Sequence, residues 1–442
     1  MTGPAAGTSC WEPAEVPPVP PLQGIVTADV AVVGAGLAGL ACAHHLTERA
    51  PGLDVAVIDA RRPAAGASGR GTGLLGPRAG PPVDRALRRY GPRDARRMHL
   101  ASERAVRAVL DLCERLDAPC APRPGPQIMA ARSPSGLVAL SRQARAYRTL
   151  GLDVPVLTGP AVRARVGVPY AAGLLHRTAA TLDPAALTCA IARACATKGV
   201  RFYGDSPLCA VHPGDLTGPE LVFPHGRLYA RQAVLAVNSA AGQLGLPVGT
   251  VLPLEVYALS TAPLSGDARD ALGHGTGHAL VDALPLAPYF RLLPDGGLVA
   301  GGGTAVAPAG LAPPRLQAGR ERAWAWLERW MRSLHPHLLD VRVTHRWSGR
   351  IGVTADGLPV VGPVRGLSDV WYIGGCNGHG LAMSAAHGAY VARALLGEPA
   401  ACDADTLPWH RSAAPRFPAG GPALPLLRAY TDILGRFTRR VC

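Results

Sequence analysis

The clearest binding motif in the sequence is the stretch 34–39, which reads Gly-Ala-Gly-Leu-Ala-Gly and has three glycines. An apolar run at 29–33, typical of a buried strand, precedes them, and a helical stretch follows. In such a unit Gly34 would make the tight turn, Gly36 would let the backbone approach a pyrophosphate, and Gly39 would allow close helix–strand packing. The helix N-terminus would offer unpaired N–H groups to the phosphates. The motif therefore predicts a dinucleotide site, and the residues expected to contact the dinucleotide are Gly34, Ala35, Gly36 and Gly39.

An aspartate stands where a unit of this kind binds the ribose. Asp59 follows a second predicted strand, 54–58, and lies 23 positions beyond Gly36. A carboxylate there binds free ribose hydroxyls, which disfavours NADP but leaves both FAD and NAD open. If the glycines only turned a tight loop, neither the flanking strands nor Asp59 would be explained.

The chain is large enough to position these residues in two domains. It has 442 residues, of which 48% are hydrophobic, so it can build substantial cores. No apolar run reaches the ~20 residues of a membrane span, and residues 1–21 lack the order of a secretory signal, so we expect a cytoplasmic protein. The ten cysteines form no Cys-x-x-Cys pair and no compact cluster with histidine, so no metal is expected.

The charge balance does not point to nucleic acid. The formal net charge is +14, but Lys198 is the one lysine among 45 basic residues. Abundant arginine beside abundant alanine, glycine and proline indicates a coding bias rather than a selected basic face. The expected partner is a small molecule, and the sequence leaves the oligomeric state open.

The predicted elements alternate between helices and strands, without internal repeats. Helices are predicted at 85–116 with a break at Gly91-Pro92, at 184–198 behind an Asp183 N-cap, at 315–334 and at 381–396. Further strands are predicted at 200–203 and 232–237, and strands and turns alternate from 251 to 303. This mosaic indicates an α/β chain whose Rossmann-type cofactor domain is discontinuous, with a sheet-rich α+β substrate domain inserted. The expected division is an N-terminal arm at 1–24, a cofactor domain of 25–95, 166–252 and 345–400, a substrate domain of 96–165 and 253–344, and a C-terminal tail at 401–442.

Eight short segments together resemble the FAD-dependent D-amino-acid oxidase and glycine oxidase superfamily, most closely its bacterial γ-glutamylputrescine oxidase-like amine oxidoreductases. In order, they are Gly34 to Gly39, Gly66 to Gly73, Leu182-Asp183-Pro184, Val251 to Leu254, Tyr289-Phe290-Arg291, Trp347 to Arg350, Asp356 to Pro359, and Gly374 to Gly380. No segment is decisive alone; their order and spacing carry the resemblance. It runs from the Ser9-Cys10-Trp11 arm to about Gly397, most of the chain.

The resemblance implies that FAD lies extended across the Rossmann-type domain, with its isoalloxazine ring facing the substrate domain. In such relatives the loop corresponding to 66–73 packs along the flavin, and a helix start, here Gly378-His379-Gly380, faces the ring's pyrimidine edge. A helix N-terminus there stabilises the negative charge of reduced flavin near N1. The expected FAD contacts are Gly34, Ala35, Gly36, Gly39, Asp59, Ala60, Arg61, Ala67, Ser68, Thr72, Gly73, Leu208, Ala236, Gly349, Gly378, His379, Gly380 and Leu381.

The loop at 66–73 departs from the pattern of these relatives. It has Gly71-Thr72 where they often carry Asn-Gly, so side-chain contacts of the relatives at these two positions are not carried over. It contains no His or Cys suited to the covalent flavin links of some relatives, so non-covalent FAD is expected. By itself the loop could equally be a flexible surface segment.

Arg291 is the first candidate for substrate recognition, because it matches the Tyr-Phe-Arg pattern of the nearest relatives; the alternative is a structural ion pair. Glycine-oxidase-like relatives place their carboxylate-binding arginine where Leu293 stands here, and residues two apart share a strand face. His379 and Arg291 are also the candidates for catalysis, although a packed or capping role is the alternative for His379. The remaining pocket candidates are Tyr257, Cys376 and Asn377.

The implied reaction is oxidation of the C–N bond of an amine or amino acid to an imine, which hydrolyses to a carbonyl compound and ammonia or an amine. Oxygen is the expected acceptor, giving H2O2. The alternatives are an FAD-dependent dehydrogenase with another acceptor and a non-catalytic flavoprotein subunit. The acceptor stays open because the strand 297–302 lacks the lysine that sarcosine-oxidase-like members place above the flavin.

Overall fold

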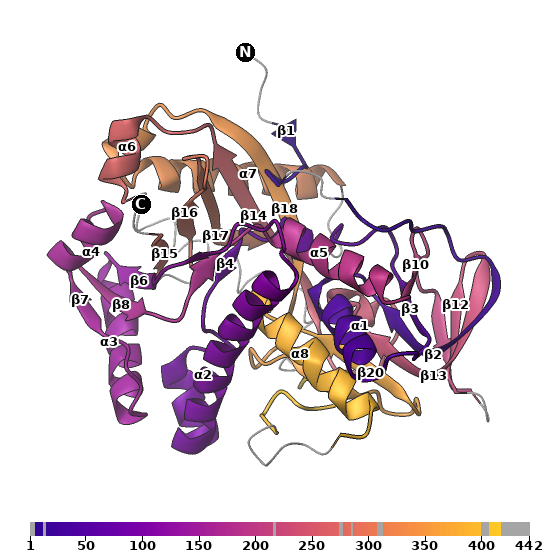
Figure 1. The fold of residues 1–442 in the computed structure, drawn as a ribbon. Coiled ribbons are helices and arrows are strands. Elements are labelled where there is room, and N and C mark those ends of the chain that lie inside the picture. The colour runs from indigo at the N-terminus through magenta and orange to yellow at the C-terminus, as the bar shows by residue number, and fades with distance from the viewer. Residues whose placement is uncertain are drawn as a thin grey trace.

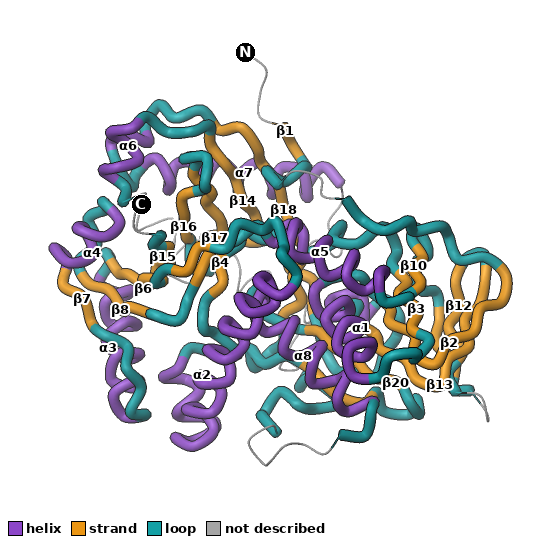
Figure 2. The backbone as a smooth tube through the Cα atoms, viewed as in Figure 1, coloured by secondary structure: helices purple, strands orange, loops and turns teal. Residues whose placement is uncertain are grey.

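A computed structural model describes residues 5–11, 15–214, 218–273, 277–283, 286–306, 313–398 and 406–416. Figure 1 shows two sheet-bearing parts of the molecule, and Figure 2 shows most strands gathered in two groups on either side of helices α2, α5 and α8.

The first sheet carries the predicted dinucleotide unit. Its parallel strands run in the order β10 (Arg201–Tyr203), β3 (Val55–Ile58), β2 (Gly24–Val33) and β13 (Gly226–Leu235). The end of β13 pairs in parallel with β20 (Val370–Gly374), and its beginning pairs with β12 (Glu220–Phe223). The antiparallel strands β11 (Ala210–His212) and β19 (Val360–Pro363) complete the sheet. Strands β2 and β3 are almost wholly apolar where they are buried, as expected of parallel strands covered on both faces.

Three helices lie side by side over this sheet: α1 (Leu37–Arg49), α5 (Pro184–Thr197) and α8 (Gly380–Leu395) (Figure 1). Helices α1 and α8 cross closely, because a Cβ on Gly388 would lie only 2.4 Å from the Ala38 carbonyl oxygen. The Asp183 carboxylate caps α5 by accepting from the N–H groups of Ala185 and Ala186 at 2.8 and 3.0 Å. The predicted N-cap is therefore confirmed.

The second sheet is larger and mixed. Its nine strands run in the order β1 (Ala5–Ala6), β18 (Val343–Val353), β14 (Leu252–Thr261), β17 (Leu298–Val306), β16 (Tyr289–Leu292), β15 (Ala279–Asp282), β6 (Gln127–Ala131), β8 (Ala172–His176) and β7 (Val156–Thr158). The helices packed around it are α3 (Pro134–Thr149), α4 (Gly159–Val166), α6 (Gly266–Ala271) and α7 (Pro313–Arg332). Trp330 and Met331 of α7 are fully buried in its core.

Helix α2 (Val83–Arg115) joins the two parts, since it contacts both α8 and α3. Gly91 has a φ of 77° and interrupts it, as the Gly91-Pro92 pair predicts. A small third sheet of β4 (Leu74–Leu75), β9 (Ala180–Thr181) and β5 (Arg123–Pro124) lies between the parts. Short 3-10 turns occur at Ser68–Arg70, Asn238–Gly242 and Pro336–Leu338.

Two segments differ from the expected division of the chain, and the described parts of the arm and the tail each contact a sheet. Residues 172–176 and 345–353 were assigned to the cofactor domain, but β8 and β18 pair within the nine-stranded sheet. The N-terminal arm is not free, because β1 adds to β18 at the sheet edge. In the described part of the tail, Trp409 is buried and its carbonyl accepts from the N–H of Val361. These corrections follow from long-range strand pairing, which local periodicity does not reveal. None of the described helices is both long and apolar enough to cross a membrane.

Candidate cofactor and substrate site

A cavity of about 2340 Å³ lies between the two large sheets and is lined by both. We call the part lined by Gly34, Gly36, residues 59–61 and 207–209, and Ala236 the dinucleotide end. The part lined by the nine-stranded sheet, by α3 and by the segment 76–82 is called the chamber. The volume exceeds the ~300–1,000 Å³ of an ordinary small-ligand pocket, so it can hold a dinucleotide and a substrate together.

Each glycine of the turn at the dinucleotide end is explained by the atoms that a side chain there would meet. Gly34 has a φ of 109°, and a Cβ there would lie 2.6 Å from the Ala236 carbonyl oxygen. A Cβ on Gly39 would lie 2.0 Å from the carbonyl oxygen of Gly34, so a side chain would push α1 away from the turn. A Cβ on Gly36 would meet only the Ser68 hydroxyl, at 3.0 Å, and this face lines the cavity. Backbone is thus left accessible where a pyrophosphate would lie.

Asp59 fixes this turn while lining the cavity. Its Oδ2 accepts from the N–H of Ala35 and its Oδ1 from the N–H of Arg61, both at 2.8 Å. Burial raises the pKa of the carboxyl, and the two N–H donors oppose that shift. The second glycine-containing loop lies close by, because the Ser68 hydroxyl accepts from the N–H of Leu37 at 2.9 Å. The loop 66–73 therefore packs against the N-terminus of α1, and is not a detached surface segment.

The cavity brings together most of the expected cofactor residues. Two expected contacts, Ala35 and Gly39, are outside the lining. The Ala35 N–H donates to Asp59 within the turn, and Gly39 lets α1 pack closely against the turn. The lining contains Gly34, Gly36, Asp59, Ala60, Arg61, Ala67, Ser68, Thr72, Gly73, Leu208, Ala236, Gly349, Gly378, His379, Gly380 and Leu381.

The start of α8 is the second helix N-terminus at the cavity. Gly378 has a φ of 83°, and the closest atom to a Cβ there would be Cδ1 of Ile351 at 3.5 Å, so the backbone stays open to the cavity. Asn377 has a φ of 52°; its Oδ1 accepts from the N–H of Thr354 at 3.0 Å, and its Nδ2 donates to the Gly375 carbonyl. Asn377 therefore fixes the turn before the helix, and its amide is already engaged.

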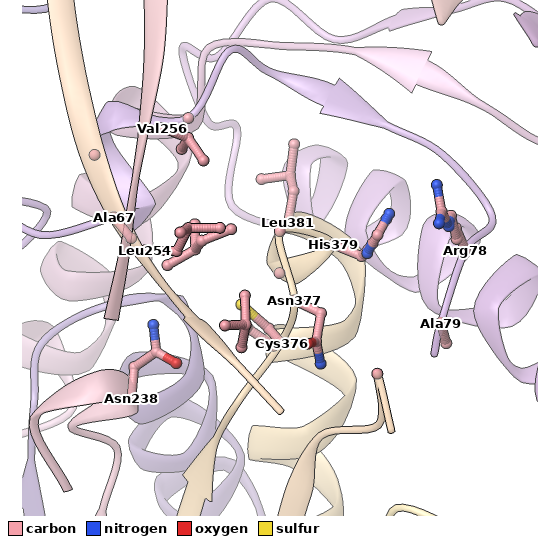
Figure 3. A pocket seen from close by; sticks show the side chains of 18 of the residues that line it. Ala67, Arg78, Ala79, Asn238, Leu254, Val256, Cys376, Asn377, His379 and Leu381 are labelled. Atoms are coloured by element: carbon pink, nitrogen blue, oxygen red, sulfur yellow. The ribbon is translucent and has the colours of Figure 1, made fainter. Parts of the chain in front are cut away.

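His379 and Cys376 both line the cavity and are uncharged (Figure 3). Burial, and then the positive charge of Arg78, hold the pKa of His379 well below its usual value. Its Nδ1 is buried without a hydrogen-bond partner. Burial raises the pKa of the Cys376 thiol, which stays protonated.

Arg291 does not line the cavity, which favours a structural role, although its hydrogen-bond partners are backbone carbonyls rather than the expected ion pair. Its Nε donates to the Thr72 carbonyl at 2.7 Å, its Nη2 donates to the Leu182 carbonyl at 2.8 Å, and its guanidinium lies 5.2 Å from the centre of the Trp11 ring. Burial lowers its pKa to about 10, so it stays charged at neutral pH. Arg291 therefore supports the loop 66–73 from outside the cavity, through contacts that its position on a strand does not predict.

Tyr257 does line the chamber, beside an ion pair that the sequence did not suggest. Arg320 of α7 reaches the buried Glu255 with Nε–Oε1 and Nη2–Oε2 distances of 2.9 and 3.1 Å. The Ser348 hydroxyl donates to the same carboxylate at 2.6 Å. Burial and the Glu255 charge raise the pKa of Tyr257, whose hydroxyl is buried without a hydrogen-bond partner. No motif signals this group, because its members lie on separate elements.

A Rossmann-type unit joined to a mixed sheet across one large cavity is the architecture of a dinucleotide-dependent oxidoreductase. The family model described as FAD dependent oxidoreductase (DAO) matches residues 29–394, and the chain belongs to that family. The resemblance found in the sequence is thereby confirmed.

The chain is 28% identical over 397 residues to the gamma-glutamylputrescine oxidoreductase of Escherichia coli strain K12, covering 88% of each chain. Its fold matches glycine oxidase from Geobacillus kaustophilus with a TM-score of 0.69 at 20% identity, over 87% of this chain and 99% of the other. It matches L-proline dehydrogenase from P. horikoshii with a TM-score of 0.69 at 17% identity, over 92% and 99%.

The residues present fit FAD. Gly36 and Gly378 leave backbone open to the cavity at two helix N-termini, and Asp59 lies where a ribose would bind. Among the described residues, no group of three or more His, Cys, Asp or Glu side chains could hold a metal ion.

Proposed function

We propose that this FAD-dependent oxidoreductase oxidises the C–N bond of an amine or amino acid to an imine, with FAD held non-covalently. The observation that carries the proposal is one continuous cavity, lined by the glycine turn of α1, by the start of α8 and by the nine-stranded sheet. The names of a curated relative and of two fold neighbours, quoted above, describe enzymes of amines or amino acids. Non-covalent attachment rests on the absence of His and Cys from 66–73.

Bound FAD would supply the hydride acceptor, and the protein's part is to bind, orient and dehydrate the substrate. Leu254, Val256 and Leu381 give the cavity an apolar wall beside the start of α8 (Figure 3). A dehydrated wall lowers the pKa of a bound ammonium group, so it favours the neutral amine that hydride transfer requires. The start of α8 would stabilise negative charge on the reduced cofactor.

His379 has a defined place in this scheme. Its imidazole is neutral at physiological pH, and Nδ1 has no protein partner. It can therefore hydrogen-bond the substrate, whereas a charged imidazolium would repel an ammonium group. A dedicated base is not required, because desolvation alone can deprotonate the amine.

For the electron acceptor we favour oxygen, with a dehydrogenase that uses a non-oxygen acceptor as the second candidate. A positive charge beside the flavin promotes electron transfer to oxygen by stabilising superoxide-like charge. Lys198 is paired with Glu48 at 3.2 Å and is absent from the cavity lining, whereas Arg78 and Arg320 are part of it. Stopped-flow reoxidation in air-saturated buffer tests this point: a rate no faster than that of free reduced flavin, with fast turnover on a dye, would favour the dehydrogenase.

The main experiment is an anaerobic screen of amines and amino acids against the purified yellow protein. Bleaching of the flavin bands by at least one compound is expected, with the matching carbonyl product after air is admitted. A protein that binds FAD but is bleached by none of them would favour the non-catalytic flavoprotein. Acid precipitation should leave the colour in the supernatant; colour in the pellet would contradict non-covalent attachment.

A further inference from the structure

Two buried cysteines at the end of α2 lie in direct contact. Cys113 is in the last turn of the helix, and Cys120 follows it after a short loop. Their sulfur atoms are 3.3 Å apart and share a hydrogen bond. Both are free thiols, and the two residues are 2% and 0% exposed. An S–S bond measures about 2.0 Å, so a small change in side-chain torsions would bring the two sulfurs within bonding distance.

The loop between the two cysteines is folded tightly by its own backbone. The N–H of Ala118 donates to the Cys113 carbonyl at 3.0 Å, and the N–H of Cys120 donates to the Ala118 carbonyl at 2.7 Å. Asp117 and Ala121 each have a φ of 43°, a left-handed conformation that is costly for residues other than glycine. Such conformations persist only where the surrounding structure imposes them, so the contact between the thiols is maintained by a specific turn.

This turn is connected to the loop 66–73 beside the cofactor site. The Cys120 carbonyl accepts from the N–H of Asp183 at 2.8 Å, and the N–H of Leu182 donates to the Gly73 carbonyl at 3.0 Å. Strand β5, which follows the turn, pairs with β9, and β9 pairs with β4 directly after the loop. A covalent bond at Cys120 would therefore restrain the segment against which this loop ends.

The hydrogen bond between the two thiols makes them chemically unequal. It lowers the pKa of the Cys120 thiol, although burial opposes that shift, and together with burial it raises the pKa of Cys113. A thiolate is the form that attacks a peroxide, and a neighbouring thiol can then close the disulfide. Asp117, Pro119 and Ala121 are exposed, so local opening of this surface turn gives a small neutral oxidant access to the sulfurs.

We propose that Cys113 and Cys120 are an oxidative modification site, which hydrogen peroxide closes to a disulfide and a thiol reductant reopens. The Cys120 thiolate attacks one peroxide oxygen and the O–O bond breaks, which gives a sulfenic acid and, with one proton, water. The Cys113 sulfur then displaces the sulfenic hydroxyl, which leaves as a second water with the Cys113 proton. Two thiols and one H2O2 thus give one disulfide and two waters, and the two electrons pass from the sulfurs to the peroxide.

The test treats the FAD-loaded full-length protein with hydrogen peroxide, alkylates the remaining free thiols and digests the protein with trypsin. Arg115 lies between the two cysteines, so the dithiol form releases them in separate peptides and the disulfide form releases one linked pair. The linked pair should be the main disulfide product, lighter by two hydrogens than its two peptides together, and dithiothreitol should abolish it.

The disulfide should also stabilise the intact protein. It closes a loop of about eight residues in a chain of this length, so the oxidised protein should have a Tm about 2–3 °C above that of the dithiol form. Dithiothreitol should reverse this shift together with the cross-link. A linked form with a lower Tm would overturn the proposal, because it would show that the bond distorts the native turn.

Cys113→Ser and Cys120→Ser each remove one thiol, and both should abolish the linked pair and the rise in Tm. In Cys113→Ser the sulfenic acid of Cys120 has no thiol to resolve it, so dimedone should label that residue. Cys195→Ser is the matched control, since it removes another fully buried thiol and its hydroxyl can keep the hydrogen bond to the Leu40 carbonyl. This control should form the linked pair as the wild type does. If one serine variant does not fold, the wild-type digest and the other variant decide the question.

The exposed Cys209 shows whether peroxide has reacted with the protein at all. Oxidation of Cys209 without a linked pair would overturn the proposal, and so would a disulfide between other cysteines in equal yield. Because the peroxide is added, the result depends neither on the substrate nor on the electron acceptor. A failed amine screen would leave this site standing, and the absence of the linked pair would leave the proposed amine oxidation untouched.

Discussion

The two ends of the cavity present different kinds of surface to a ligand. At the dinucleotide end the surface is largely backbone: the turn at Gly34 and Gly36, held by the Asp59 carboxylate through two N–H groups. In the chamber the surface is made of side chains, and Arg78, His176 and Tyr257 come from three segments distant in sequence. Backbone recognition needs a short continuous motif, whereas side-chain recognition needs the whole fold.

Two arginines illustrate the same difference. Arg291 matches a family pattern, yet it is buried against the carbonyls of Thr72 and Leu182 and supports the cofactor loop. Arg78 matches no pattern, yet it lines the chamber, and its Nε is buried without a hydrogen-bond partner among the described residues. Burial alone does not distinguish a structural arginine from a ligand-binding one; the partners do.

The largest effect is expected at the dinucleotide end, from Gly36→Val. A branched side chain there would occupy the space of the pyrophosphate. Within the protein its Cβ would meet only the Ser68 side chain, so the fold should tolerate it. The Kd for FAD should rise at least about a thousandfold, which corresponds to about 4 kcal/mol of lost affinity. Flavin absorbance per protein, with the Tm of the apoprotein, measures it. Gly66→Ala is the control, because nothing lies within 4 Å of its Cβ position; full FAD occupancy in Gly36→Val would refute the cofactor assignment.

Arg291→Met tests the contrast between the two arginines. Leaving the Thr72 and Leu182 carbonyls unsatisfied should lower the free energy of unfolding by about 2–6 kcal/mol, at about 1–3 kcal/mol for each buried group. Denaturant unfolding measures the loss, and the amines that bleach the flavin should be the same as for the wild type. A variant of normal stability that those amines no longer bleached would return Arg291 to substrate recognition.

The chamber histidines predict a pH dependence of stability. The pKa of His176 is depressed from about 6.5 to about 3 by burial, so the unfolded chain binds an extra proton between these values. Stability should therefore be complete above pH ~6.5 and fall as the pH drops towards 3, reaching a loss of about 2 kcal/mol at pH 5 from this residue. His176→Gln should show a shallower decline in denaturant titrations between pH 7 and 5. An equally steep decline in both proteins would mean that His176 is not buried in its neutral form.

The smallest effect is expected from Asp59→Asn. The amide keeps one oxygen for the Ala35 N–H but turns a donor towards the Arg61 N–H, and it loses the charge that favours a ribose. The Kd for FAD should rise about tenfold, or about 1.4 kcal/mol, measured by fluorescence quenching of added FAD. Asp205→Asn, at a residue outside the cavity lining, serves as the control. No change in Kd for Asp59→Asn would show that this carboxylate only fixes the turn.

The sequence by itself determined the cofactor half of this protein. Gly34, Gly36, Gly39 and Asp59 lie within one strand–turn–helix–strand unit, so their spacing along the chain fixes their spacing in space. The Asp183 cap and the break at Gly91 were predictable for the same reason, because each depends on backbone geometry within a few residues.

Only the tertiary structure decided the chamber and the limits of the two parts. Strands β8 and β18 joined the larger sheet through pairing with distant strands, which no local pattern encodes. Whether Arg291 or Arg78 faces the cavity depended on which carbonyls and carboxylates the fold placed beside each guanidinium. The sequence gives the type of each side chain, but packing between segments far apart along the chain sets its burial and its partners.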